Sequence, residues 1–153
     1  MGAQCDANQK QDIEKLLYAG NAVRIFPQGY SMYPMFVPGR DEAVIRPLAG
    51  RRFRRGDVVL YRREGSILVL HRIWNVRPEG VYFVGDNQTQ IEGPLHPQQI
   101  RGILTSFVRS GREISVRHPL YLIYSHLWLL FRPFRQKISN FIHFFNKNCN
   151  LVL

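Results

Sequence analysis

Short apolar runs rich in Val, Ile, Tyr and Phe, separated by Gly, Pro, Asn and Asp, fill the chain from Ala22 to about Val116. This spacing is typical of an all-β domain, because short strands alternate with tight turns. Ser110-Gly111-Arg112 predicts a hairpin turn between the last two strands. Two earlier breaks, at 63–66 and 77–79, predict an antiparallel meander of the third, fourth and fifth strands. We therefore predict a mainly β fold with a small antiparallel, barrel-like sheet. Its strands are expected at residues 22–26, 42–46, 57–62, 67–76, 80–84, 100–109 and 113–116.

A short amphipathic segment precedes the predicted strands. Ile13, Leu16 and Leu17 fall on one face of a helix over residues 9–18, and Gly20 follows as a stop signal. The same end of the sequence has no positively charged region followed by an apolar run. We therefore expect neither a signal peptide nor a membrane anchor there.

Two apolar stretches follow the predicted strands. Residues 120–131 are apolar almost all round but too few to span a hydrocarbon core. Beyond Pro133, aromatic and aliphatic residues are interleaved with Arg135, Lys137 and Lys147, which suits an interfacial helix with a basic face. The alternative, in which these helices cover an open end of the barrel, stays open. The chain thus divides into a helical lead-in (1–21), a β domain (22–117) and a basic, aromatic-rich C-terminal helical segment (118–153).

The composition fits one folded domain with a basic surface. Hydrophobic residues make up 45% and charged residues 21% of the 153 residues, close to ordinary globular usage. Lys and Arg outnumber Asp and Glu by 21 to 11, and no acidic residue follows Glu113, so a polyanion or an anionic membrane is an expected neighbour. Cys5 and Cys149 lie at opposite ends without metal-site spacing. We expect two free thiols and no metal site, and a solvated loop at the basic run 51–55.

Ser31 is the candidate nucleophile. It lies between Gly29 and Pro34, directly after the first predicted strand, and Pro34 cannot continue a strand ladder. The hydroxyl would therefore stand on a bend at the end of the sheet, with the Ser31 N–H free to face a developing oxyanion. A lone serine in such a turn is far more often a turn residue, so the prediction depends on the motifs around it.

Four motifs, in this order and spacing, resemble those of the signal peptidase I and LexA-like serine peptidase superfamily. Gly29-Tyr30-Ser31-Met32-Tyr33-Pro34 resembles its Ser-x-Met-x-Pro nucleophile box, and Arg55-Gly56-Asp57-Val58-Val59-Leu60 resembles its Gly-Asp-hydrophobic strand. Leu70-His71-Arg72-Ile73 is similar to the histidine-arginine pair of the archaeal and endoplasmic-reticulum type, where bacterial-type members have a lysine. Val84-Gly85-Asp86-Asn87 resembles the Gly-Asp-Asn box. The resemblance covers roughly residues 23–108 and implies the small β peptidase fold of that superfamily.

This resemblance implies that Ser31 is the nucleophile of a serine peptidase and that His71 is its general base. Alternation along residues 67–73 places His71 on an apolar face, where a neutral imidazole, the resting state of a general base, is favoured over its cation. A core histidine bonded to backbone groups is the alternative. Asp86 is expected to accept a hydrogen bond from the second ring nitrogen and fix the tautomer, with Glu92 as the other candidate acid.

The resemblance also bears on the oxyanion hole and the substrate. Gly29 stands where the family often has a serine that joins the oxyanion hole, so this hole would use main-chain donors such as the Ser31 N–H. The family implies small side chains on both sides of the cut, in an Ala-x-Ala manner. We expect Phe26, Met32 and Tyr33 to line the apolar pockets for them. No cofactor is needed.

We therefore expect a serine endopeptidase that cleaves signal or leader peptides from a peptide or preprotein substrate. Typical signal peptidases carry an N-terminal transmembrane helix, and in its place we expect peripheral contact with an anionic membrane through residues 118–153; the side of the membrane is left open, and without such contact the location would be cytoplasmic. A LexA-like self-cleaving regulatory domain is one alternative, but it needs a DNA-binding domain before the barrel, where only about twenty residues stand. A non-enzymatic basic β-barrel that binds anionic lipid or nucleic acid is the other; the peptidase hypothesis itself predicts no nucleic-acid partner.

Overall fold

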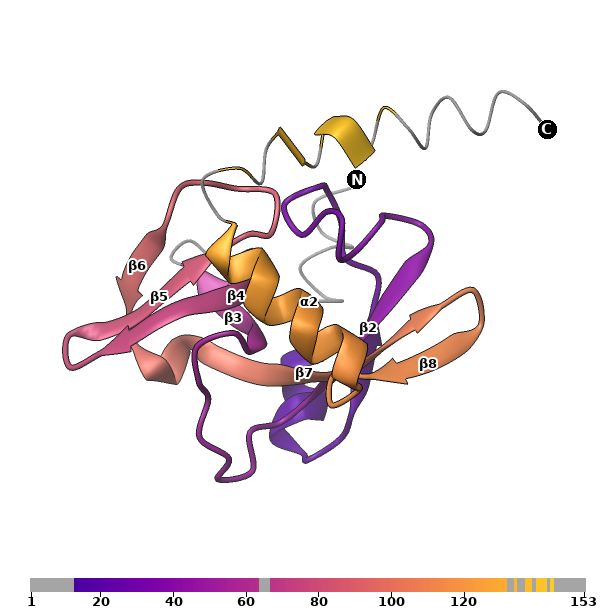
Figure 1. Ribbon diagram of the computed structural model, residues 1–153. Helices are drawn as coiled ribbons and strands as arrows, with labels where there is room; N and C mark the ends of the chain where they lie inside the picture. The colour runs from indigo at the N-terminus through magenta and orange to yellow at the C-terminus, as the bar shows by residue number, and fades with distance from the viewer. Residues whose placement is uncertain are drawn as a thin grey trace, which may run out of the picture.

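The computed structural model shows one antiparallel sheet with helices before and after it (Figure 1). It describes residues 13–63 and 67–131, together with 134, 137, 138, 140–142 and 144. The sheet has eight strands in the order β1-β2-β7-β3-β4-β5-β6, and β8 pairs with β7. The strands are β1 (Val23–Ile25), β2 (Asp41–Arg46), β3 (Val58–Arg63), β4 (Ile67–Arg77), β5 (Gly80–Val84), β6 (Glu92–Leu95), β7 (Ile100–Arg109) and β8 (Arg112–Ser115). Residues 13–18 are helical, and the named helices are the 3₁₀-helix η1 (Pro97–Gln99) and α2 (Pro119–Leu130).

The mainly β fold is confirmed, and each of the seven predicted strands matches an observed strand to within one residue at both ends. The predicted hairpin is also confirmed, since Arg109 pairs with Arg112 across Ser110 and Gly111. Both turn residues have a positive φ, 51° and 74°, the conformation that matches the twist of two paired strands. The described strands do not close into a barrel, however, because β1 and β6 stand at opposite ends of the strand order.

Strand β6 was absent from the predicted strands. Gly93 and Pro94 indicate a break, because proline has no N–H for a strand ladder. At the edge of a sheet the missing N–H is tolerated, because an edge strand forms hydrogen bonds with a neighbour on one side only. β6 pairs with β5 so that Glu92 lies opposite Phe83. From this position the Glu92 carboxylate accepts a hydrogen bond from Tyr61 of β3 at 2.7 Å.

The helical lead-in packs against the sheet through Leu17, which is buried in the main core cluster, and through Ile13. Leu16 had been predicted on the same face, but its side chain is 47% exposed. The helix ends at Gly20, where a φ of 87° turns the chain so that the Asn21 N–H bonds to the Leu16 carbonyl at 2.9 Å. The first part of the predicted range, residues 9–12, lies outside the described residues.

Strand β3 is buried on both faces, and this divides the interior into two clusters. Val58 and Leu60 belong to the larger cluster, which also receives the helical lead-in. Val59 and Tyr61 belong to a second cluster, shared with β5 and β7. Because side chains alternate along a strand, β3 and its neighbour β4 present different residues to two separate interiors.

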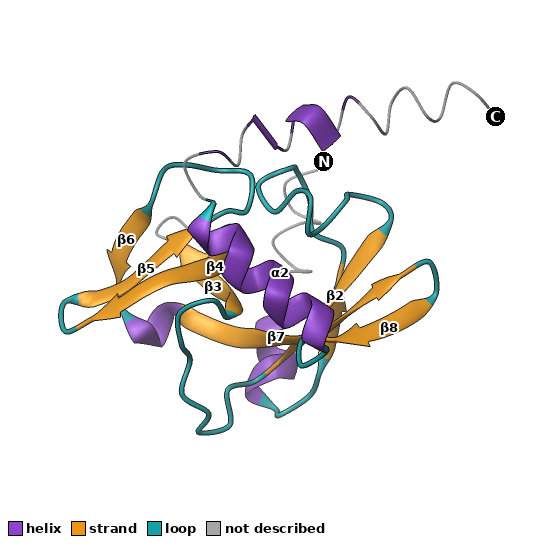
Figure 2. Cartoon of the chain, viewed as in Figure 1, coloured by secondary structure: helices purple, strands orange, loops and turns teal. Residues whose placement is uncertain are grey.

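Helix α2 lies across the sheet (Figure 2). It begins at Pro119, where the His118 side chain accepts a hydrogen bond from the Leu120 N–H. Its inner side packs on the sheet through buried residues Tyr121, Ser125, Trp128 and Leu129. In the part of the chain that the structure describes, no helix is long and apolar enough to cross a membrane. Of the helix predicted beyond Pro133, residues 137, 138, 140–142 and 144 are helical; Arg135 and Lys147 lie outside the described residues.

Candidate active site

Ser31 lies in a turn between β1 and β2. Gly29 has a φ of 73°, which favours glycine at this position, and the buried side chains of Met32 and Phe36 hold the turn in the core. The Ser31 carbonyl accepts the Asn87 N–H at 2.8 Å. Among the residues that the structure describes, none accepts a hydrogen bond from the Ser31 N–H. That donor is therefore available to a ligand.

A groove of about 770 Å³ passes both Ser31 and His71. One wall is β1 with the residues that follow it, including Phe26, Gly29 and Met32, and the other is the first half of β4. Within the described chain, no hydrogen bond joins the Ser31 hydroxyl to the His71 ring. Tyr33 had been predicted to line the groove, but it is only 5% exposed and is not among the lining residues.

His71 is almost fully buried, at 3% exposed. Burial lowers the pKa of its imidazole to about 4, because a cation is poorly solvated in the apolar interior. The ring is therefore neutral at pH 7, which is the state that a general base needs. Burial of the ring is thus the physical reason for the neutral imidazole that side-chain alternation predicted.

Tyr61 decides which nitrogen of His71 can act as the base. Its hydroxyl lies 3.1 Å from His71 Nδ1 and donates to Glu92 Oε2 at 2.7 Å. A phenol has one hydrogen to donate. Since that hydrogen goes to Glu92, the hydroxyl accepts the proton of Nδ1, and Nε2 is left with a free lone pair. The chain His71–Tyr61–Glu92 thus fixes the tautomer in which Nε2 carries the free lone pair.

Glu92 is held ionised at the end of this chain. Arg63 donates to both of its oxygens, at 2.6 and 2.5 Å. Burial acts against ionisation of Glu92, but the hydrogen bonds from Arg63 and Tyr61 outweigh it and lower the pKa of the carboxyl. Glu92 Oε2 lies 3.8 Å from His71 Nδ1, so a full negative charge stands close to the ring when it takes up a proton.

Asp86 has a different partner from the expected one. Both of its oxygens accept from Arg72, at 2.8 and 2.7 Å, and both side chains are completely buried. The reason is alternation along β4: His71 and Arg72 are neighbours, so they point to opposite faces of the strand. Asp86 lies with Arg72 on the face under α2, whereas Glu92 lies near His71 through Tyr61. Of the two candidate acids, the structure therefore brings Glu92 to the histidine.

The Gly-Asp-Asn motif instead supports the turn that carries Ser31. A side chain at Gly85 would place its first carbon 2.6 Å from the Ser31 carbonyl oxygen, so the two backbones touch. Helix α2 holds this motif from behind, since Trp128 Nε1 donates to the Asp86 carbonyl at 2.9 Å. Arg72 also donates to the Gly56 carbonyl at 2.9 Å. Hydrogen bonds therefore link all four motifs, from Ser31 to Asn87, from Asp86 to Arg72 and from Arg72 to Gly56.

Tyr61 and Arg63 were not among the predicted site residues. A signal for Tyr61 was present, because the predicted antiparallel pairing of the third and fourth strands brings it within a diagonal of His71; the structure pairs Val59 with His71 and Tyr61 with Val69. The sequence offered no such signal for Arg63, whose partner Glu92 lies on the strand that was not predicted.

No group of three His, Cys, Asp or Glu side chains in the described ranges could hold a metal ion. Comparison of the chain with models of known protein families gives no match, and comparison with curated proteins gives none either.

Proposed function

We propose that the chain is a serine endopeptidase of the signal-peptidase type, which cleaves signal or leader peptides. The observation that carries this proposal is that Ser31 and a buried, neutral His71 line one groove. They come from separate elements, and the motif resemblance had assigned them complementary roles. The free N–H of Ser31 and the fixed tautomer of His71 support the same chemistry.

The residues have defined tasks in this reaction. Ser31 Oγ attacks the peptide carbonyl while His71 Nε2 takes its proton, and the Ser31 N–H donates to the oxyanion. The imidazolium that forms is stabilised by Glu92 through Tyr61. His71 then returns the proton to the leaving amine, and a water molecule activated by the same Nε2 hydrolyses the acyl-enzyme.

Two strand edges in the groove suit an extended peptide. Among the described strands, β1 pairs only with β2, and the first half of β4 pairs only with β3, because the pairing with β5 begins at Arg72. The free edges of Val23–Ile25 and of residues 67–71 can each form main-chain hydrogen bonds with a substrate. Apolar side chains such as Phe26 and Leu68 line the groove between them, which fits small apolar residues beside the cut.

A serine-reactive fluorophosphonate and a fluorogenic peptide with an Ala-x-Ala segment test the proposal. We expect Ser31→Ala to abolish both labelling and cleavage. The matched control is Ser115→Ala, because Ser115 is an exposed serine at the end of β8, and it should behave as the wild type. Undiminished labelling and cleavage in Ser31→Ala would refute the proposal. Absent labelling together with steeply salt-dependent binding to single-stranded nucleic acid would favour the basic binding domain instead.

A further inference from the structure

Helix α2 is apolar on its outer side as well as its inner side. Leu120, Ile123, Leu127 and Leu130 follow one another at spacings of three, four and three residues, so they form one stripe along the helix. Their side chains are between 47% and 71% exposed. A helix on the surface of a globular domain normally places charged or polar residues on this side, and the stripe therefore needs a partner.

The exposed apolar residues are concentrated in this part of the molecule. Of the fifteen large hydrophobic residues that are exposed in the described chain, nine lie at or beyond Leu120. They include Phe131, next to the stripe, and Phe134, Phe141 and Phe144 after it. Single exposed apolar residues are normal, but a contiguous group marks an interaction surface.

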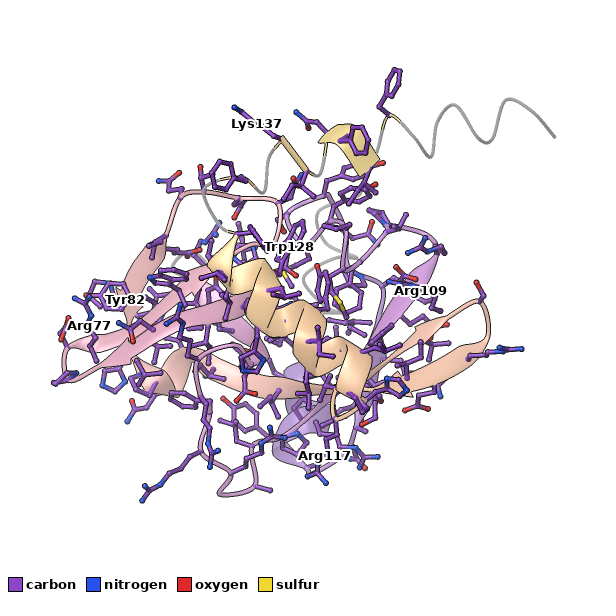
Figure 3. All side chains as sticks on the ribbon, viewed as in Figure 1. Arg77, Tyr82, Arg109, Arg117, Trp128 and Lys137 are labelled. Carbon is purple, nitrogen blue, oxygen red and sulfur yellow. The ribbon has the colours of Figure 1, made fainter. Side chains whose placement is uncertain are left out.

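The charges around the stripe are mostly positive; the one carboxylate of the neighbouring loop, Asp57, is paired with Arg51. The sequence has no Asp or Glu after Glu113, and Arg117 and Lys137 lie before and after the helix (Figure 3). The loop between β2 and β3 meets α2 at its end, where the Ser125 hydroxyl donates to the Gly56 carbonyl. This loop carries four exposed arginines: Arg51, Arg52, Arg54 and Arg55. An apolar stripe with a basic rim is complementary to an anionic lipid surface, which offers acyl chains beneath a layer of negative headgroups.

We propose that the outer face of α2, defined by Leu120, Ile123, Leu127 and Leu130, docks into the interfacial region of an anionic lipid bilayer. The helix would lie in the plane of the interface, with its inner side still packed on the sheet. That inner side is bonded to the Asp86 carbonyl through Trp128, and the adjacent Asn87 N–H is bonded to Ser31. The docked helix would therefore be bonded directly to the Gly-Asp-Asn motif, which in turn is bonded to Ser31. The proposal stands on the surface alone and does not require the peptidase activity.

Co-sedimentation of the full chain with vesicles tests the docking. We expect binding to vesicles of phosphatidylcholine with phosphatidylglycerol, weaker binding when salt is raised, and little binding to phosphatidylcholine alone. The double variant Ile123→Gln/Leu127→Gln should lower the partition coefficient roughly tenfold or more, since both side chains leave the acyl region. Val76→Gln is the matched control, because Val76 is 44% exposed on β4, and it should bind as the wild type. Circular dichroism confirms that each variant is folded.

The alternatives give different results in the same experiments. Equal vesicle binding by the wild type and the folded double variant would overturn the proposal, as would the absence of binding to anionic vesicles. Sedimentation velocity without lipid tests a second copy as the occupant: a dimer that the double variant converts to monomer would also overturn it. Ser31→Ala protein should bind vesicles as the wild type does, so failure of docking and failure of the peptidase proposal are told apart.

Discussion

The charge of Glu92 offers the sharpest test of the site. Glu92→Gln removes the negative charge but keeps the size of the side chain and an oxygen that can accept from Tyr61 and Arg63. The expected tautomer of His71 is therefore retained, and only the charge beside Nδ1 is lost. Any change in catalysis then reports the stabilisation of the imidazolium.

The distance sets the size of the effect. Two unit charges separated by the 3.8 Å between His71 Nδ1 and Glu92 Oε2 interact by about 4 kcal/mol at an effective dielectric constant of about 20. The Arg63 guanidinium bonded to the same carboxylate repels the imidazolium and offsets part of this, which leaves about 2 kcal/mol. A loss of about 2 kcal/mol of transition-state stabilisation lowers kcat/KM roughly 30-fold.

The pH profile separates this effect from simple structural damage. In the wild type, the acid limb of kcat/KM should lie near pH 4, the pKa of His71. Glu92 raises that pKa and Arg63 lowers it, so Glu92→Gln should move the acid limb to lower pH while the plateau falls. Kinetics with the fluorogenic peptide between pH 3.5 and 8, on protein of unchanged melting temperature, provide the measurement.

Variants of tyrosine complete the comparison. Tyr61→Phe should also lower kcat/KM, because His71 Nδ1 loses its acceptor. Tyr82→Phe is the matched control, since Tyr82 lies on β5 and its hydroxyl donates to the exposed Glu79. Wild-type kinetics in both Glu92→Gln and Tyr61→Phe, with activity lost in a folded Asp86→Asn variant, would show that Asp86 is the acid and that this reading of the site is mistaken.

Three further predictions concern the framework around the site. Asp86→Asn leaves the buried Arg72 without its charge partner, so the free energy of unfolding should fall by about 3–5 kcal/mol in urea denaturation; an unchanged midpoint would contradict a structural role for the pair. Gly85→Ala places a methyl group 2.6 Å from the Ser31 carbonyl oxygen, so both the melting temperature and kcat/KM should fall, and a variant as stable as the wild type would disprove that contact. The buried imidazole of His71 takes up a proton near pH 4, whereas an unfolded histidine does so near pH 6.5, so the unfolded state binds the proton first. The His71 contribution to stability is therefore full above about pH 6.5 and falls by about 3 kcal/mol as the pH drops to about 4, and the part of this slope above about pH 5 should be absent in His71→Gln.

Much of the fold follows from local properties of the sequence. The seven predicted strands and the turn at Ser110-Gly111 were found because alternation, turn residues and β-branched residues act over a few positions. β6 escaped prediction because Pro94 is tolerated only at the end of a sheet, and the strand order is a property of the whole chain. The sequence failed to predict the open sheet for the same reason, since closure into a barrel depends on whether the first and last strands of the order pair with each other.

The candidate site divides in the same way between sequence and structure. The sequence by itself singled out Ser31 and His71, and alternation along one strand was enough to place the histidine on an apolar face. It could not tell whether Asp86 or Glu92 lies near that histidine, because the answer depends on which face of β4 each carboxylate reaches. Tertiary structure decided this: packing under α2 joins Asp86 to Arg72, and the pairing of β5 with β6 brings Glu92 to Tyr61. Contacts between residues far apart in the chain, and the burial that shifts the pKa of His71, exist only once the strands have assembled.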